Sequence, residues 1–405
     1  MKKTLSFLFL YYLRFFAKIQ IAKDKLINPQ LKIVGITGSA GKSSTLLASQ
    51  AALTPQFKVK TNYGANSESG IPLNILSFQN PDYSFFSWLK IALLIPFKII
   101  FYWPKFDIYL LEMGIDSKNT PKNMSFLLSI VHPDIAIFLN VSPVHLENFS
   151  SLEEIAQEKA KLINQAKTAI INPLDPLVVK FTTNKNKIFI KPQKITLKNY
   201  FLPQIYDISI GAAFTLAKHF GLKKIQILEN ITKNFQLPAS RSSLLKGINN
   251  STIIDSSYNS SPLSVEELLK FLAIFSSPKI AVLGDMRELG VASKQSHQYL
   301  YKSALKNADQ VISVGPETSR YFGPKAKKFL YWWQASEYLK KCLPENSTLL
   351  VKGSQNSIFL EELVKELIPP THLNYYLSNH LICRQSPYWI KVKSNFRNSV
   401  LLSTK

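Results

Sequence analysis

The pair Lys42-Ser43 follows a glycine-containing turn, Thr37-Gly38-Ser39-Ala40-Gly41, which comes after an apolar run at residues 31–36. A strand that ends in such a turn and restarts as a helix directs backbone N–H groups and the positive end of the helix dipole at one point, which suits a polyphosphate. Lys42 is expected to reach the β- and γ-phosphates, and the Ser43 hydroxyl to bind Mg²⁺. In the usual phosphate loop the first glycine would fall at Ile36. We predict a phosphate site, with an ordinary structural turn as the alternative.

Two further side chains with metal-binding chemistry follow predicted buried strands. Glu112 ends the apolar run 107–113, and His145 follows the run 135–140. The carboxyl ends of parallel strands meet at one edge of a sheet, so both groups are placed to hold Mg²⁺ against a phosphate chain. A lone Glu or His is more often structural, and only their shared position beside the phosphate loop favours a site. The polar loop 62–72 follows another short strand and is expected to contact the nucleotide or an acceptor.

The elements that must position these residues alternate between strand and helix. After a predicted hinge at 237–241 the alternation restarts and continues from residue 252 to residue 367. Such alternation predicts an open, largely parallel sheet of Rossmann-like form. No G-x-G-x-x-G is present, so a dinucleotide cofactor is not indicated. The Lys-rich stretch 184–200 predicts a small hairpin. The predicted fold class is α/β, with a central phosphate-loop domain on a parallel sheet and a C-terminal Rossmann-like domain.

The composition of the chain limits the classes of molecule that it is expected to bind. A chain of 405 residues suggests two or three domains, and its 49 basic and 26 acidic residues give a formal net charge of +23. That charge favours nucleotides, anionic lipid headgroups or acidic cell-wall precursors, while a lysine-rich proteome is the alternative explanation. Nothing in the chain resembles a nucleic-acid-binding module. Two cysteines cannot form a disulfide framework, and a chain without such a framework is typical of a reducing compartment.

Two apolar segments, 1–30 and 84–103, interrupt this pattern. The apolar run of the first is too short to span a bilayer, and the second contains Lys90, Pro96 and Lys98. Each is predicted to be a helix at a membrane surface, with packing against the protein's own body as the alternative. Together they favour a cytoplasmic protein with peripheral contact to the inner face of the membrane.

Seven stretches in order resemble the Mur ligase family, ATP-dependent ligases that form amide bonds in peptidoglycan precursors. They are residues 35–43, 66–72, 111–114, 140–147, 257–262, 284–290 with His297, and 351–354. The resemblance covers roughly residues 34–367. It implies a central ATP-binding domain at 31–239 with a hydrophobic insertion at 84–103, a C-terminal domain at 240–370, an N-terminal segment at 1–30 and a tail at 371–405.

The resemblance also implies an activity: addition of D-alanyl-D-alanine to a muramoyl-tripeptide, with ATP and Mg²⁺, through an acyl phosphate and with release of ADP. The nucleotide-binding residues that it implies are Thr37, Gly38, Ser39, Ala40, Gly41, Lys42, Ser43, Ser44 and Asn259. The implied metal ligands are Ser43, Glu112, His145 and Lys159, the last as a carbamate. The implied catalytic residues are Lys42, His145, Lys159 and Arg241, while Lys352 and Ser354 correspond to positions that approach the peptide or the incoming dipeptide.

The chain departs from the family pattern at several places. Ser256 replaces a usual acidic residue, Ser209 an adenine-contacting asparagine and Gln355 an arginine. Only residues 1–30 precede the phosphate-loop domain, so the family's UDP-sugar-binding domain is not expected, and the acceptor is expected to be held by its peptide or by a lipid carrier. The alternatives are a ligase of the same superfamily that acts on folate or on a lipid-linked precursor, and a degenerate nucleotide-binding scaffold protein.

Overall fold

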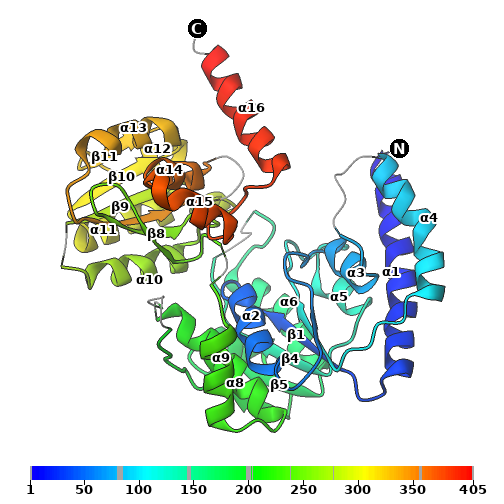
Figure 1. Cartoon of the computed structure of the whole chain (residues 1–405). Coiled ribbons are helices and arrows are strands. Elements are labelled where there is room, and N and C mark those ends of the chain that lie inside the picture. Colours follow the sequence, from blue (N-terminus) through cyan, green and yellow to red (C-terminus); the bar gives the residue numbers. More distant parts are fainter. Residues whose placement is uncertain are drawn as a thin grey trace. The chain divides into compact units, whose positions relative to one another are not determined.

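The computed structural model describes residues 2–79, 85–143, 147–197, 202, 204–237, 239–276, 278–354 and 358–403. The chain divides into two compact units, which we call unit 1 (Met1–Ile195 with Tyr206–Gln236) and unit 2 (Thr196–Ile205 with Leu237–Lys405). Each unit contains a six-stranded sheet with helices against it (Figure 1). The predicted α/β fold class is confirmed for both.

The sheet of unit 1 is parallel throughout. Its strands lie in the order β2-β3-β1-β4-β5-β6, and every neighbouring pair is parallel. Their bounds are β1 Lys32–Thr37, β2 Val59–Thr61, β3 Ile108–Glu112, β4 Ile135–Phe138, β5 Thr168–Ile171 and β6 Lys187–Phe189. Strand β6 lies where a hairpin was predicted. It pairs in parallel with β5 instead, so that prediction is wrong over the described residues.

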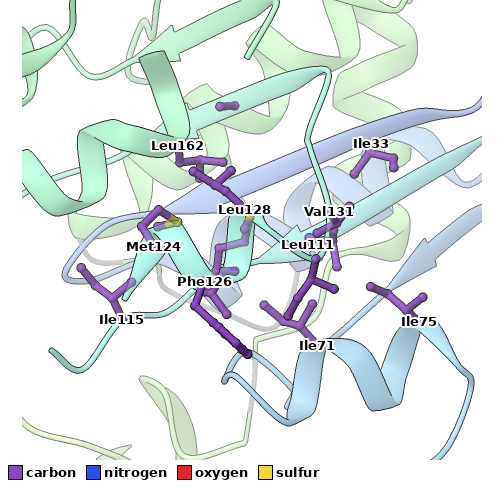
Figure 2. Close-up of a cluster of buried hydrophobic side chains, with 14 of the residues drawn as sticks. Ile33, Ile71, Ile75, Leu111, Ile115, Met124, Phe126, Leu128, Val131 and Leu162 are labelled. Atoms are coloured by element: carbon purple, nitrogen blue, oxygen red, sulfur yellow. The ribbon is translucent and has the colours of Figure 1, made fainter. Parts of the chain in front are cut away.

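Helices cover the sheet of unit 1 and bury its apolar strands. They are α1 Lys2–Ile27, α2 Lys42–Leu53, α3 Gly70–Ile75, α4 Phe85–Phe101, α5 Met124–Leu128, α6 Leu152–Gln165, α7 Pro176–Phe181, α8 Ile205–His219 and α9 Lys224–Asn234. Figure 2 shows Leu111 of β3 in one cluster with side chains from α3, α5 and α6. Strands β3 and β4 are buried at every position, which explains their unbroken apolar sequence. No described helix has the length and hydropathy needed to cross a bilayer.

The sheet of unit 2 has the order β11-β10-β9-β12-β8-β7, with β7 antiparallel at one edge and the other pairs parallel. Its strands are β7 Ser243–Lys246, β8 Thr252–Ser256, β9 Lys279–Gly284, β10 Gln310–Val314, β11 Ala326–Phe329 and β12 Thr348–Lys352. Successive residues of a strand point to opposite faces. Leu349 and Val351 therefore join one hydrophobic cluster while Leu350 joins another.

The helices of unit 2 enclose these two clusters and continue into the tail. They are α10 Pro262–Ala273, α11 Ser293–Asn307, α12 Pro316–Tyr321, α13 Trp332–Cys342, α14 Leu360–Glu366, α15 Pro370–Ser378 and α16 Pro387–Ser403, with a 3₁₀ turn at Gly290–Ala292. The tail contributes buried Tyr376 and Ile382 to the cluster that contains Leu349 and Val351. It therefore packs as part of unit 2.

Candidate active site

The predicted phosphate loop joins β1 to the N-terminus of α2, as its residue types require. Gly41 precedes the helix with φ +81°, and Gly38 has φ +156°, both in a region that L side chains rarely adopt. A Cβ at Gly38 would lie 3.0 Å from the Leu139 Cβ, and one at Gly41 would lie 3.0 Å from the Ser209 Oγ. Strand β1 lies between β3 and β4, where the strand order of the sheet reverses. Open α/β sheets bind ligands at this point.

Asn140, directly after β4, holds the loop in place. Its Oδ1 accepts a hydrogen bond from the Ala40 N–H at 2.8 Å, its Nδ2 donates to the Ala40 carbonyl at 3.1 Å, and its own carbonyl accepts from the Ser39 N–H at 3.0 Å. The motif 140–147 contains Asn140 but indicates no role for it. An amide that can donate and accept at once, at a strand end beside the loop, was the available signal.

Glu112 lies at the end of β3 with its carboxylate against the first turn of α2. The Ser43 Oγ donates to Glu112 Oε2 at 2.8 Å, and the Asn66 Nδ2 donates to Oε1 at 2.8 Å. Asn62 fixes the Glu112 backbone, since its Oδ1 accepts from the Glu112 N–H at 2.7 Å and its Nδ2 donates to the carbonyl at 2.9 Å. The structure therefore brings together two of the four predicted metal ligands, Ser43 and Glu112, with the polar loop 62–72 beside them.

The oxygen donors of Ser43 and Glu112 suit Mg²⁺, which is usually bound through one or two carboxylates, several waters and the substrate's phosphates. Over the described part of the chain, no group of three or more His, Cys, Asp or Glu side chains is arranged to hold a metal. A pair of protein oxygens next to a phosphate loop fits this sparse mode of binding. His145 lies outside the described residues, so its predicted role as a ligand stays a prediction.

Two lysines converge on the carbonyl of Gly38. The Lys42 Nζ donates to it at 2.9 Å, and the Lys159 Nζ, from α6, donates to it at 3.3 Å. Lys159 is almost fully buried, at 2% exposure. Its burial and then the nearby Lys42 charge lower the Lys159 pKa well below its usual value, although Asp116 and Glu158 act in the opposite direction. A lowered pKa increases the fraction of neutral amine at a given pH, and it is the neutral form of an amine that reacts with CO₂ to give a carbamate.

The remaining predicted residues of unit 1 hold the backbone around the loop. The Thr37 Oγ1 donates to the Met113 carbonyl at 3.1 Å, and Ser44 is buried in the first turn of α2. The Ser39 Oγ accepts from the Ser142 N–H at 2.9 Å. Ser209 donates to the Gly41 carbonyl at 3.3 Å, so this departure from the family pattern contacts the loop itself.

In unit 2, the predicted residues Arg241 and Asn259 are neighbours of Tyr258 and Lys352. The Arg241 guanidinium lies 4.4 Å from the centre of the Tyr258 ring, and the Lys352 Nζ donates to the Asn259 carbonyl at 2.7 Å. Burial, the larger cause, and the nearby Arg241 charge together lower the pKa of Lys352 to about 7, although Asp255 acts in the opposite direction. These residues form one cluster at the carboxyl ends of β8 and β12. Gln355 lies outside the described residues.

His297 and Ser354 hold backbone groups in the same unit. The His297 Nε2 accepts from the Met286 N–H at 3.1 Å, its Nδ1 lies 2.8 Å from the Ser293 carbonyl, and the ring is fully buried. Both ring nitrogens are thus engaged, with Nδ1 as the donor. Ser354 accepts from the Arg287 N–H at 3.0 Å. His297 is therefore a structural residue of this motif.

Comparison with known families matches two models to this chain. The Mur ligase middle domain matches residues 36–227, and the Mur ligase glutamate ligase domain matches residues 240–355. The first match contains the phosphate loop, Glu112 and Lys159. The second contains Arg241, Asn259 and Lys352.

Individual relatives agree with these matches. The UDP-N-acetylmuramoyl-tripeptide–D-alanyl-D-alanine ligase of Buchnera aphidicola is 27% identical over 390 residues, covering 86% of this chain and 79% of its own. That of Bacillus subtilis is 25% identical over 390 residues, covering 86% and 78%. Among solved structures, MurF of Acinetobacter baumannii superposes with a TM-score of 0.70 at 19% identity, covering 90% of this chain and 80% of that one. MurF ligase of Thermotoga maritima in complex with ADP gives 0.68 at 21%, covering 89% and 84%.

Proposed function

Because this chain belongs to the Mur ligase family, we propose that it is an ATP-dependent, ADP-forming ligase of peptidoglycan precursor synthesis. Its proposed substrates are a muramoyl-tripeptide and D-alanyl-D-alanine, the pair named for the relatives from Buchnera and Bacillus. The observation that carries the proposal is the Ser43–Glu112 hydrogen bond of 2.8 Å at the first turn of α2. This hydrogen bond lies beside the glycine turn 37–41, and a glycine turn that leads into a helix N-terminus suits a phosphate.

The proposed chemistry makes an amide in three steps. An oxygen of the acceptor carboxylate attacks the γ-phosphorus of ATP, and the β–γ bond breaks to release ADP and leave an acyl phosphate. The amine of the dipeptide attacks the acyl carbon, giving a tetrahedral intermediate. This intermediate then expels phosphate, and the amine loses its proton.

The residues of unit 1 have electrostatic tasks in this scheme. The loop amides, the N-terminus of α2 and Lys42 bind the phosphates and stabilise the charge that develops on them. Ser43 and Glu112 would hold Mg²⁺, which supplies charge neutralisation when bound. Lys159, as a carbamate, would add an anionic oxygen near Gly38, and His145 is proposed as a further ligand. From the family resemblance, Arg241 stays a proposed catalytic residue and Asn259 a proposed nucleotide-binding residue.

The test supplies the purified chain with ATP, Mg²⁺, UDP-muramoyl-tripeptide and D-alanyl-D-alanine, and measures ADP release together with the mass of the product. Lys42→Ala should lower the rate of ADP release about 100-fold or more, since it removes a charge next to the transferred phosphoryl group. The matched control is Lys32→Ala, an exposed lysine at the start of β1, the end of that strand away from the glycine turn, which should keep the wild-type rate.

Two results would overturn the proposal: no amide product from the wild-type chain, or equal rates for Lys42→Ala and the wild type. Replacing D-alanyl-D-alanine by glutamate or by a mixed pool of amino acids identifies the amine. The same assay in CO₂-free buffer tests the carbamate, because activity should fall and bicarbonate should restore it. An unchanged rate without CO₂ would exclude the carbamate at Lys159 and leave the ligase proposal standing.

A further inference from the structure

Helices α1 and α4 form a pair on unit 1. Phe9 of α1 packs edge-on against Trp88 of α4, with ring centres 5.0 Å apart, and the Tyr12 hydroxyl donates to the Ala92 carbonyl at 2.7 Å. Farther along α1, Lys23 donates to the Tyr102 carbonyl at 2.6 Å. Early residues of α1 thus contact early residues of α4, and late residues contact late ones. The two helices therefore run parallel and side by side, as Figure 1 also shows.

One face of this pair is anchored to the rest of unit 1. Leu13 and Ala17 of α1 and Ile95 of α4 are fully buried in the same hydrophobic cluster as the central strands. Asn28, just after α1, donates to the Phe106 carbonyl at 2.9 Å. The pair is therefore a fixed part of unit 1, and its buried and exposed faces are well defined.

Three polar side chains of α1 lie on the inner face of the pair, where an ordinary surface helix carries apolar residues. Gln20, Lys23 and Asp24 of α1 are buried, at 1%, 9% and 2% exposure. Gln20 donates to the Asp24 carboxylate at 2.6 Å, and Lys23 donates to the Ile99 and Tyr102 carbonyls at the end of α4. Lys23 also lies 4.0 Å from the centre of the Trp103 ring. Each of these three inward side chains thus has at least one polar partner within the protein.

The outer face carries large apolar side chains at helical spacing. On α4 and just beyond it, these residues are between 42% and 79% exposed, namely Phe86, Leu89, Leu93, Leu94, Phe97, Ile100, Phe101 and Trp103. On α1 a second stripe recurs at helical spacings of three, four, four and seven residues, namely Leu8, Tyr11, Phe15, Ile19 and Leu26. Exposed apolar stripes on two adjacent helices make a patch larger than isolated surface residues would, and such patches mark interaction sites.

The charges around this face have one sign. Lys18 of α1, Lys90 of α4 and Lys105 after α4 are exposed, while α4 contains no acidic residue and Asp24, the one acidic residue of α1, is buried. Lysines beside an apolar stripe can extend their charged ends to lipid headgroups while their stems contact the apolar surface. Tyr102 and Trp103 at the end of α4 are the aromatic types enriched at membrane–water interfaces.

We propose that the outer face of α1 and α4 docks onto the surface of an anionic phospholipid bilayer. Because the opposite face of the pair is packed on the core of unit 1, both helices would lie in the plane of the interface, with their apolar stripes below the headgroups. The positive charges and the absence of exposed carboxylates on the described part of the pair match an anionic surface. This proposal does not depend on the ligase activity, because none of its residues belongs to the phosphate loop.

The test is flotation of the purified full-length chain with vesicles of phosphatidylglycerol and phosphatidylcholine, and in parallel with phosphatidylcholine alone. The wild type should float with the anionic vesicles, and its binding to them should weaken as salt is added, because salt screens exposed charges. The double substitution Leu93→Glu with Phe97→Glu should lower the partition coefficient about tenfold or more, because it places two carboxylates in the stripe. Ile225→Glu with Val291→Glu is the matched control, at two exposed apolar positions elsewhere, and should bind like the wild type.

Two further measurements distinguish lipid binding from self-association of the chain. Fluorescence of the wild type should shift to the blue with anionic vesicles, and the shift should be smaller in Trp103→Phe. Sedimentation without lipid measures self-association. The proposal would be overturned if the wild type does not bind vesicles and forms a dimer that becomes monomeric in the variant Leu93→Glu with Phe97→Glu. In that case the face would bind a second copy of this chain. Equal binding of the wild type and that double variant to anionic vesicles would also overturn it.

Discussion

At the scale of single residues, the candidate site depends on side chains that hold backbone groups in position before any ligand arrives. Asn140 bonds both the N–H and the carbonyl of Ala40, and Asn62 does the same for Glu112. A loop ordered in advance loses less conformational entropy when it binds a phosphate chain. We therefore expect these amides to affect nucleotide affinity through the position of the loop.

The first prediction concerns Asn140. Asn140→Ala should weaken ATP binding about tenfold and lower the free energy of unfolding by about 1–3 kcal/mol, because partly buried backbone groups of the loop lose their partners. The matched control is Asn172→Ala, whose buried amide bonds Leu139 and Leu174 instead. It should lose similar stability and keep ATP affinity. Calorimetric titration with ATP and urea unfolding measure the two quantities, and equal loss of affinity in both variants would contradict this role.

The second prediction concerns the buried amine of Lys352. Its pKa is about 7 in the folded chain, against an ordinary value of 10.5. Between these pH values the unfolded chain binds a proton that the folded chain does not, so the free energy of unfolding should rise with pH across this window. Burial of the charged amine lowers the free energy of unfolding by its full amount below pH 7, and this destabilisation disappears above the ordinary pKa. The expected contribution is about 1 kcal/mol per pH unit.

Lys352→Met removes the titrating amine, so this variant is the reference against which the stability of the wild type is compared. In urea unfolding from about pH 7.5 to about pH 9.5, the stability of the wild type relative to Lys352→Met should increase steadily. Asp255, whose pKa is raised by burial to about 6, contributes little over this range. Parallel stability curves for the two chains would show that the amine remains charged in the folded state.

At the scale of elements, the tail anchors a loop of unit 2 that carries candidate site residues. Arg384, between α15 and α16, pairs with Glu361 of α14 at 2.7 Å and donates to the Ser257 and Tyr258 carbonyls at 3.0 and 3.1 Å. Glu361 is fully buried. The tail therefore fixes the turn that precedes Asn259, although it lies beyond the region matched by the family model, which ends at residue 355.

The third prediction follows from this contact. Arg384→Met should lower the free energy of unfolding by about 3–5 kcal/mol, since it leaves a buried carboxylate without its main partner. The combined substitution Arg384→Met with Glu361→Gln should recover part of that loss, because the uncompensated charge is gone. Arg320→Met is the control: its ion pair with Glu317 is exposed, and its removal should cost less than about 1 kcal/mol. A loss of that small size for Arg384→Met would show that the contact is not needed.

At the scale of the whole molecule, the chain combines two α/β units with a strongly positive charge. Each unit has its own sheet and its own hydrophobic clusters. A net charge of +23 attracts triphosphates and anionic surfaces alike, and both attractions weaken as ionic strength rises. The ligase proposal uses that charge at the phosphate loop, and the membrane proposal uses it at α1 and α4. Because the two sites consist of different residues, substitutions can separate them.

Much of the molecule could be predicted from sequence because its determinants are local. The glycine turn between β1 and α2 needs only neighbouring residues with the right backbone freedom, and the strands β3 and β4 need only short apolar runs. The alternation of strands and helices after residue 252 likewise predicted the sheet of unit 2. The sequence predicts a hairpin where strand β6 lies, because three residues carry too little pattern to indicate which neighbour they pair with.

Only the tertiary structure decided which side chains meet. Asn140 and Ala40 are 100 positions apart, and Arg384 and Ser257 are 127 apart, so no local pattern predicts their hydrogen bonds. The sequence alone left α1 and α4 either on a membrane or against the protein. The folded chain shows that one face of the pair is packed on the core and the other is exposed, because burial depends on what the whole chain places around a helix and not on the residues of the helix alone.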